Sequence, residues 1–199
     1  MRTKDKYRLL HSVAMTADDD VTSDGDYVTA YEMIDIDELA EGKRQWSVEH
    51  VVPRSHVRGD GPAESDPVGW IEATINANSR RSNHPLVLWP DSDDEVALPN
   101  TLVRFDGVMH FVPPAVQRGR LARKWLFIRA TYDEIDPPTI AQQCRAKQIV
   151  TLAQCQRVWP AEERVNQWYR KNLGWANPLL EQGSDAWYSS EDWLELIFV

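Results

Sequence analysis

Two segments of the chain concentrate side chains that can do chemistry. Residues 46–56 read WSVEHVVPRSH and place a glutamate directly before a histidine, and residues 78–83 read NSRRSN. Imidazoles exchange protons near neutral pH, carboxylate and amide oxygens bind hard cations, and guanidinium groups bind phosphates and carboxylates. Each segment alone is weak, because neighbouring side chains on a strand point to opposite faces, and Asn and Ser are common in caps and loops.

The elements that must position these side chains are a mixture of strands and helices. In chain order we expect a helix at 30–42, a strand from 46 that stops at Pro53, a helix at 68–83, a hairpin at 101–112, and helices at 118–132, about 138–158 and about 161–173. The hairpin rests on Asp106 and Gly107, a pair suited to a tight type I′ turn. Few strands with several helices predict an α+β fold.

Length and composition favour one folded domain. The chain has 199 residues, of which 42% are hydrophobic, and nine tryptophans, enough to bury a core. No apolar run approaches the ~18 residues of a membrane span, and no convincing signal peptide opens the chain, so we expect no membrane contact. The two cysteines, Cys144 and Cys155, are too few for a disulfide framework, which favours free thiols and a cytoplasmic location.

The charge distribution is uneven. A net charge of −9 argues against a protein that coats nucleic acid. However, residues 106–132 hold five basic side chains and one acidic, whereas residues 179–199 hold five acidic and no basic side chains. Two interpretations stay open: the acidic ends are ordinary solubilising surface, or they shield a basic groove or face a protein partner.

In combination, the segments resemble the bacterial endonuclease I family of ββα-metal (His-Me finger) nucleases. Residues 46–56 are similar to the family's active-site strand, and residues 78–83 to its Asn-x-x-Arg-Ser-Asn helix segment. A third block, FVPP at 111–114 followed by RGRLAR at 118–123, is similar to the entry into the family's long helix. Weaker echoes are Trp159-Pro160, Trp168 and Asn177-Pro178. The blocks keep the family's order over residues 46–178.

The resemblance implies a ββα-metal motif embedded in a mainly helical single domain. It divides the chain into residues 1–45 as an N-terminal helix and acidic loop packed on the core, residues 46–178 as the nuclease domain, and residues 179–199 as an acidic aromatic tail. The implied activity is hydrolysis of phosphodiester bonds in DNA, with RNA left open, at low sequence specificity. The implied cofactor is one Mg²⁺, for which Mn²⁺ or Ca²⁺ can substitute.

The resemblance also assigns residues. His50 would be the general base, and Glu49 and Asn78 would hold the metal, with Asn76 or Asn83 as alternative amide ligands. Arg54 and Arg81 are expected in catalysis, although Arg81 could equally pair with a carboxylate and orient Asn78. Arg58, Arg118 and Arg123 are expected to contact phosphate or nucleic acid, although Arg118 and Arg123 could equally bridge helices. His56 and Asn83 are expected to support the metal ligands.

One segment departs from the family pattern. Family members carry an Asp-Leu-His-His-Leu-like run twelve residues before the metal asparagine, but here the run beginning at Asp66 reads DPVGW. Either other residues order the site, or the site is looser than in the family. An alternative function stays open: a catalytically inactive protein that keeps the fold for interactions, or a subunit of a larger nucleic-acid-processing, defence or phage complex.

Overall fold

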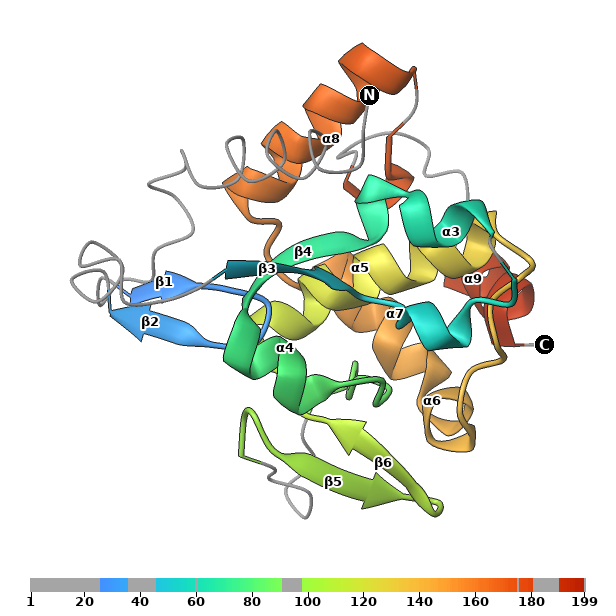
Figure 1. Cartoon of the computed structure of the whole chain (residues 1–199). Helices are drawn as coiled ribbons and strands as arrows, with labels where there is room; N and C mark the ends of the chain where they lie inside the picture. The colour runs from blue at the N-terminus through green and yellow to red at the C-terminus, as the bar shows by residue number, and fades with distance from the viewer. Residues whose placement is uncertain are drawn as a thin grey trace.

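The computed structural model describes residues 26–35, 46–59, 61–90, 98–174, 176–180 and 190–198. Its strands are β1 (Asp26–Val28), β2 (Met33–Asp35), β3 (Trp46–His50), β4 (Trp70–Thr74), β5 (Leu102–Phe105) and β6 (Val108–Phe111). Its α-helices are α3 (Pro62–Ser65), α4 (Ile75–Arg81), α5 (Ala115–Thr131), α6 (Ile140–Cys144), α7 (Ala146–Cys155), α8 (Pro160–Leu173) and α9 (Ser190–Phe198). Three two-stranded antiparallel sheets lie around the helices (Figure 1), which confirms the α+β class.

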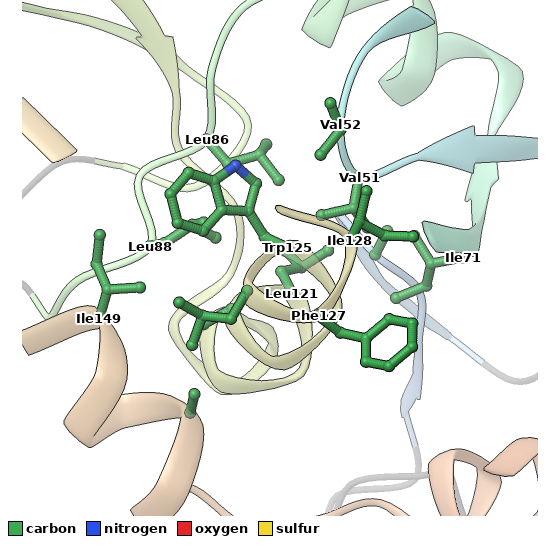
Figure 2. Close-up of a cluster of buried hydrophobic side chains, with 14 of the residues drawn as sticks. Val51, Val52, Ile71, Leu86, Leu88, Leu121, Trp125, Phe127, Ile128 and Ile149 are labelled. Carbon is green, nitrogen blue, oxygen red and sulfur yellow. The ribbon is translucent and has the colours of Figure 1, made fainter. Parts of the chain in front are cut away.

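The core surrounds helix α5. Its side chains pack against α7 and α9 on one side and against the turn before β4 on another, and residues 117–128 are buried all round the helix. Figure 2 shows the apolar part of this core, in which α5 contributes Leu121, Trp125, Phe127 and Ile128. Two groups of side chains flank the helix: Val51, Val52 and Ile71 on one side, and Leu86, Leu88 and Ile149 on the other. A helix that is buried on every face is the centre of a domain.

The basic side chains of α5 are buried with its apolar ones. Arg118 is 2% exposed and donates to the backbone carbonyl of Trp89 at 2.9 Å. Lys124 donates to the carbonyl of Val68 at 2.9 Å, and burial lowers its pKa to about 8. Of the two roles that the sequence left open for Arg118, its contacts are those of a residue that bridges segments, and Lys124 likewise holds a neighbouring segment onto α5.

Strands β3 and β4 pair antiparallel, with Trp46 opposite Thr74 and His50 opposite Trp70. Helix α4 follows β4 directly, because the Thr74 hydroxyl accepts a hydrogen bond from the amide of Ala77 at 3.2 Å and caps the helix. Two paired strands and a helix are thus contiguous in space (Figure 1). The prediction of one helix over 68–83 is wrong for residues 70–74, which form a strand, and holds for residues 75–81.

The hairpin predicted at 101–112 is confirmed. Strands β5 and β6 pair from Leu102 opposite Phe111 to Phe105 opposite Val108. The two turn residues, Asp106 and Gly107, have φ of 47° and 80°, and a type I′ turn requires positive φ at both positions.

Further differences concern helix boundaries and the two ends of the chain. The helix expected at 138–158 is two helices, α6 and α7, which meet at Arg145. Residues 33–35, predicted as part of a helix, form a strand; the remainder of the expected N-terminal helix and the acidic loop mostly lie outside the described residues. Within the segment expected to be a tail, α9 packs on α5 and α7, and Trp193 is buried.

Two findings bear on the chain's environment. Among the residues that the structure describes, none of the helices has the length and apolar character needed to cross a membrane. Both cysteines are free and exposed, which confirms the expectation of free thiols.

We expect His110 to make stability fall in mild acid. His110 is fully buried, with Nδ1 3.1 Å from the carbonyl of Val108 and Nε2 3.0 Å from the hydroxyl of Thr139, and burial lowers the pKa of its imidazole. Because the folded pKa lies below the unfolded value of about 6.5, the unfolded chain binds more protons between these values, and stability is lost as pH falls through that window. The maximum slope for one group is about 1.4 kcal/mol per pH unit.

The measurement is the free energy of unfolding in urea at pH 7.5 and 5.5, for the natural protein and for His110→Gln. The variant should lose less stability between the two pH values than the natural protein does. An equal loss in both proteins would show that His110 does not contribute.

Candidate functional site

The residues singled out in the sequence meet at one cavity, which we call the first cavity. It has a volume of about 630 Å³. The end of β3, the turn after it and the end of α4 form its walls, which consist of Ser47, Val48, Glu49, His50, Pro53, Arg54, Ser55, Asn78, Arg81, Ser82 and Asn83. Glu49, His50 and Asn78 therefore share a cavity, although β3 and α4 are separated in the sequence by about two dozen residues.

Glu49 is 3% exposed and is held by two donors. The Tyr31 hydroxyl donates to Oε1 at 2.8 Å, and the Arg81 guanidinium donates to the same oxygen. Burial raises the pKa of Glu49 above its usual range, while Arg81, the Tyr31 hydroxyl and the backbone amide of His50 oppose that rise. Both side-chain donors use Oε1, so neither of them occupies the other carboxylate oxygen. Glu49 lines the first cavity, where that oxygen can bind a cation.

Arg81 is 2% exposed, and the backbone and Glu49 take most of its donors. Besides its ion pair with Glu49, it donates to the carbonyls of His50 at 2.9 Å, Val51 at 2.8 Å and His84 at 2.9 Å. These bonds tie the end of β3 to the end of α4. Of the two roles that the sequence left open for Arg81, the contacts are those of a residue that pairs with a carboxylate and positions the site.

His50 is fixed in one tautomer by its surroundings. Its Nε2 lies 3.2 Å from the backbone carbonyl of Glu64, and a carbonyl only accepts hydrogen bonds, so Nε2 carries the proton of the neutral ring and Nδ1 keeps its lone pair. Trp70 stands edge-on to the imidazole at 5.8 Å and donates to the same carbonyl at 3.2 Å. Burial is the largest cause that lowers the pKa of His50, followed by the nearby Arg54 charge. The imidazole is therefore neutral at pH 7 and able to accept a proton.

Asn78 is oriented by Ser47. The Ser47 hydroxyl lies 3.5 Å from the carbonyl of Val48, to which it donates, and it accepts a hydrogen bond from the amide nitrogen of Asn78 at 3.0 Å. The amide oxygen is the only atom of an asparagine side chain that binds a hard cation, and the bond from the amide nitrogen to Ser47 fixes its direction. Asn76, the alternative ligand two residues earlier, is exposed and does not line the first cavity, whereas Asn83 does.

Arg54 lies on the rim of the first cavity. Its side chain is 67% exposed, and its Nε lies 2.5 Å from a carboxylate oxygen of Glu64. This ion pair leaves the two terminal amino groups of Arg54 for an anion. The position fits the expectation that Arg54 meets a phosphate group.

The three other arginines expected at a phosphate lie away from the first cavity. Arg58 is exposed, donates to the carbonyl of Asp133 at 3.1 Å and lies 3.9 Å from the carboxylate of Asp136. Arg118 and Arg123 are buried within the core, at 2% and 0% exposure. Arg123 spends all five N–H donors on protein acceptors, namely both carboxylate oxygens of Glu162 and the carbonyls of Ala153, Gln156 and Arg157. Arg118 and Arg123 therefore bridge segments of the fold, the second role that the sequence left open.

The two residues expected to support the ligands have different positions. His56 lies in the turn after Pro53 and faces a neighbouring cavity, not the first one, and burial lowers the pKa of its imidazole. Asn83 lines both cavities, next to Ser82, whose backbone has φ 53° and ψ −127°. A non-glycine residue at positive φ is strained, and such strain is found where a site needs a fixed backbone.

Sequence reasoning missed three groups that hold the site: the Tyr31 hydroxyl, the Ser47 hydroxyl and the backbone carbonyl of Glu64. Ser47 stands inside the motif and could have been suspected as a neighbour on β3. Tyr31 and Glu64 contribute through tertiary contacts, for which the sequence holds no local signal. Trp70, the last residue of the DPVGW segment, and the carbonyl of Glu64 together order His50.

The donor set suits a hard cation that is only weakly held by protein. Among the described residues, no three His, Cys, Asp or Glu side chains form a metal-binding group. One carboxylate oxygen of Glu49 and the amide oxygen of Asn78 are oxygen ligands of the kind that Mg²⁺ takes, with water and substrate phosphate filling the remaining positions. Because Arg81 balances the charge of Glu49, a substrate phosphate would have to supply part of the attraction.

A scan against models of known protein families gives no match to this chain, and neither does a search of curated proteins.

Proposed function

We propose that this protein is a divalent-metal-dependent endonuclease that hydrolyses phosphodiester bonds of DNA. The observation that carries the proposal is the shared first cavity, where His50 has a free Nδ1 and where Glu49 and Asn78 present oxygen ligands. The antiparallel pair β3–β4 followed by α4 supports it, because this is the order of elements that a ββα-metal motif requires. The two exposed free cysteines fit work in a reducing compartment such as the cytoplasm.

In the proposed reaction, Nδ1 of His50 removes a proton from a water molecule, and the water oxygen attacks phosphorus. The bond from phosphorus to the 3′ oxygen breaks, and the leaving oxygen takes a proton from solvent. The carbonyl of Glu64 holds the ring and stabilises the imidazolium that forms. A bound Mg²⁺ supplies charge stabilisation for the phosphate and the leaving oxygen.

The positive group that meets the substrate at the rim contacts only its phosphate backbone. Arg54 at the rim binds a phosphate oxygen, while Arg81 keeps Glu49 and the end of β3 in place. Phosphate contacts carry no sequence information, so low sequence specificity follows. The net charge of −9 is unfavourable for association with nucleic acid, which a basic partner protein would offset.

The test is incubation of supercoiled plasmid with the full chain and Mg²⁺ or Mn²⁺, followed on a gel. Nicked and linear products should form with either metal and disappear in EDTA. Products that persist in EDTA would overturn the requirement for a metal.

Asn78→Ala should weaken the use of metal. Loss of a direct oxygen ligand is expected to raise the Mg²⁺ concentration needed for half-maximal cleavage at least about tenfold. Loss of a residue that only hydrogen-bonds to a metal ligand already lowers metal affinity by about 10- to 100-fold. Titration of Mg²⁺ against the initial cleavage rate measures this shift. Asn76→Ala is the matched control, because Asn76 is exposed on the same helix and outside the first cavity. A larger shift for Asn76→Ala than for Asn78→Ala would show that the ligand register is wrong.

A second candidate is a non-catalytic interaction protein on the same fold. Two observations favour it: the net charge of −9, and the ion pair through which Arg81 neutralises Glu49. The plasmid assay separates the two functions. Absence of cleavage by the natural protein with both metals, together with an intact thermal transition, would favour the interaction protein.

A further inference from the structure

A second cavity adjoins the first. It has a volume of about 440 Å³, and Pro53 and Asn83 belong to the walls of both cavities. The turn after β3, the hairpin strand β6 and the end of α5 surround it. Its volume lies in the range of about 300–1,000 Å³ that small-molecule sites occupy.

Arg129, in the last turn of α5, is the positively charged group of this cavity. Its guanidinium lies over the indole ring of Trp125 at 4.9 Å, and its Nε is buried without a hydrogen-bond partner among the described residues. Burial lowers the pKa of Arg129 to about 10, so the side chain stays charged at neutral pH. Although Nε is buried, Arg129 as a whole is only half-buried and lines the cavity, so the rest of its side chain can meet an anion there.

The other charged and titratable groups of the second cavity leave Arg129 available. Asp136 interacts with Arg129 electrostatically, but its carboxylate also lies 3.9 Å from Nε of Arg58. His56, on the wall contributed by the turn after Pro53, and His84, beyond α4, complete the titratable groups of the lining. The remaining wall mixes polar residues, such as Asn83 and Thr139, with the apolar side chains of Val108 and Met109, which are not buried.

We propose that the second cavity binds the nucleotide next to the scissile phosphate, with its phosphate on Arg129 and its base against the apolar side chains of Val108 and Met109. The inference rests on the proposed function, because a strand bound in the first cavity is what delivers a neighbouring nucleotide. Because Pro53 and Asn83 line both cavities, the two lie next to each other, as the binding sites of successive nucleotides of one strand would. Arg129 is then a residue that binds substrate and does not act on the reacting atoms.

The test measures binding and turnover separately. Binding of a fluorescein-labelled 12-nucleotide single strand is followed by anisotropy in EDTA, where no cleavage occurs. Arg129→Gln should raise the Kd about 10- to 100-fold, the effect expected when a charged hydrogen bond to phosphate is lost. With Mg²⁺, the same substitution should raise KM for the oligonucleotide to a similar extent and leave kcat within about twofold.

A second variant tests the cavity independently, in case Arg129→Gln does not fold. Val108 is 40% exposed on β6, so Val108→Trp fills the cavity without removing a buried contact, and it should raise the Kd about as much as Arg129→Gln does. Lys147→Gln, on the exposed surface of α7 and outside both cavities, is the matched control for loss of one positive charge and should leave the Kd within about twofold.

Each outcome decides the inference. An unchanged Kd for Val108→Trp together with an unchanged Kd for Arg129→Gln would overturn it, as would thymidine 5′-monophosphate that binds the natural protein without competing with the oligonucleotide. A protein that binds the oligonucleotide through Arg129 but never cleaves it would leave the second cavity established and the nuclease activity refuted. Cleavage with normal KM in Arg129→Gln would support the nuclease activity and refute the role of the second cavity.

Discussion

His50→Ala should lower the rate of plasmid cleavage by about 10²–10⁴-fold at saturating Mg²⁺, the usual contribution of a general base. The imidazole is held by the carbonyl of Glu64 with Nδ1 unprotonated, and alanine at this position has no group that could accept the proton. The initial rate of nicking measures the effect. The metal requirement should not change, because His50 is not a ligand in the proposed site.

The control for His50→Ala is chemical rescue. A folded variant that lacks only a base should regain part of its rate when free imidazole is added, and the thermal transition should confirm that the variant folds. The pattern of outcomes identifies the role of the residue. Cleavage at the natural rate in His50→Ala would mean that another group accepts the proton, and a loss without rescue or with a lowered transition temperature would indicate a structural role.

The part of the site that could be predicted from the sequence is the part encoded by short motifs. Glu49, His50 and Asn78 lie in two segments whose local order identifies them, and the structure brings all three to the first cavity. The hairpin turn at Asp106 and Gly107 is also local, because positive φ at two successive residues depends only on their own side chains.

The strand at 70–74 shows where local signals conflict. Residues 68–83 are expected to form one helix, yet pairing with β3 selects the extended conformation for residues 70–74, where Trp70, Ile71 and Thr74 are all common in strands. Thr74 marks the boundary, since its hydroxyl caps α4. A threonine before an apolar helical stretch is a helix-start signal, so this boundary was within reach of sequence reasoning.

The break between α6 and α7 was not within reach of sequence reasoning. Arg145 has φ −108° and ψ 14° and interrupts the helix without a glycine or proline. Its guanidinium lies 4.8 Å from the ring of Trp89 and 5.0 Å from that of Phe105. These partners lie far away in the sequence, so only the tertiary structure reveals the contact that accompanies the break.

The arginines of α5 likewise show that the sequence does not reveal which basic side chains are buried and which line a cavity. A basic run on a helix usually faces solvent, and the five basic residues within 106–132 left a basic groove open as one interpretation. In the structure Arg118 and Arg123 are buried because backbone carbonyls and Glu162 satisfy them, whereas Arg129, on the same helix, keeps an unpaired donor at a cavity. Sequence type and spacing do not distinguish these cases, because the acceptors come from other parts of the chain.

Arg123→Met should destabilise the protein by about 3–5 kcal/mol, the cost of removing one partner of a buried ion pair. Arg123 and Glu162 are buried, with Nε–Oε1 and Nη2–Oε2 distances of 3.0 and 2.6 Å. The substitution leaves the Glu162 charge and the backbone carbonyls of Ala153, Gln156 and Arg157 without their donor. Glu162 also accepts from the amide of Trp159 at 3.0 Å at the start of α8, so α5, α7 and α8 loosen together.

Urea unfolding at pH 7 measures the loss, which corresponds to a fall of roughly 6–20 °C in Tm for a chain of this size. Arg58→Met is the matched control: Arg58 is also an arginine with carbonyl partners, but it is exposed, and its ion pair with Asp136 at 3.9 Å should contribute no more than about 1 kcal/mol. Combining Arg123→Met with Glu162→Leu should recover part of the loss, because the double variant buries no unpaired charge. A loss for Arg123→Met no larger than that for Arg58→Met would mean that water reaches the pair, and that Arg123 is available to bind a ligand after all.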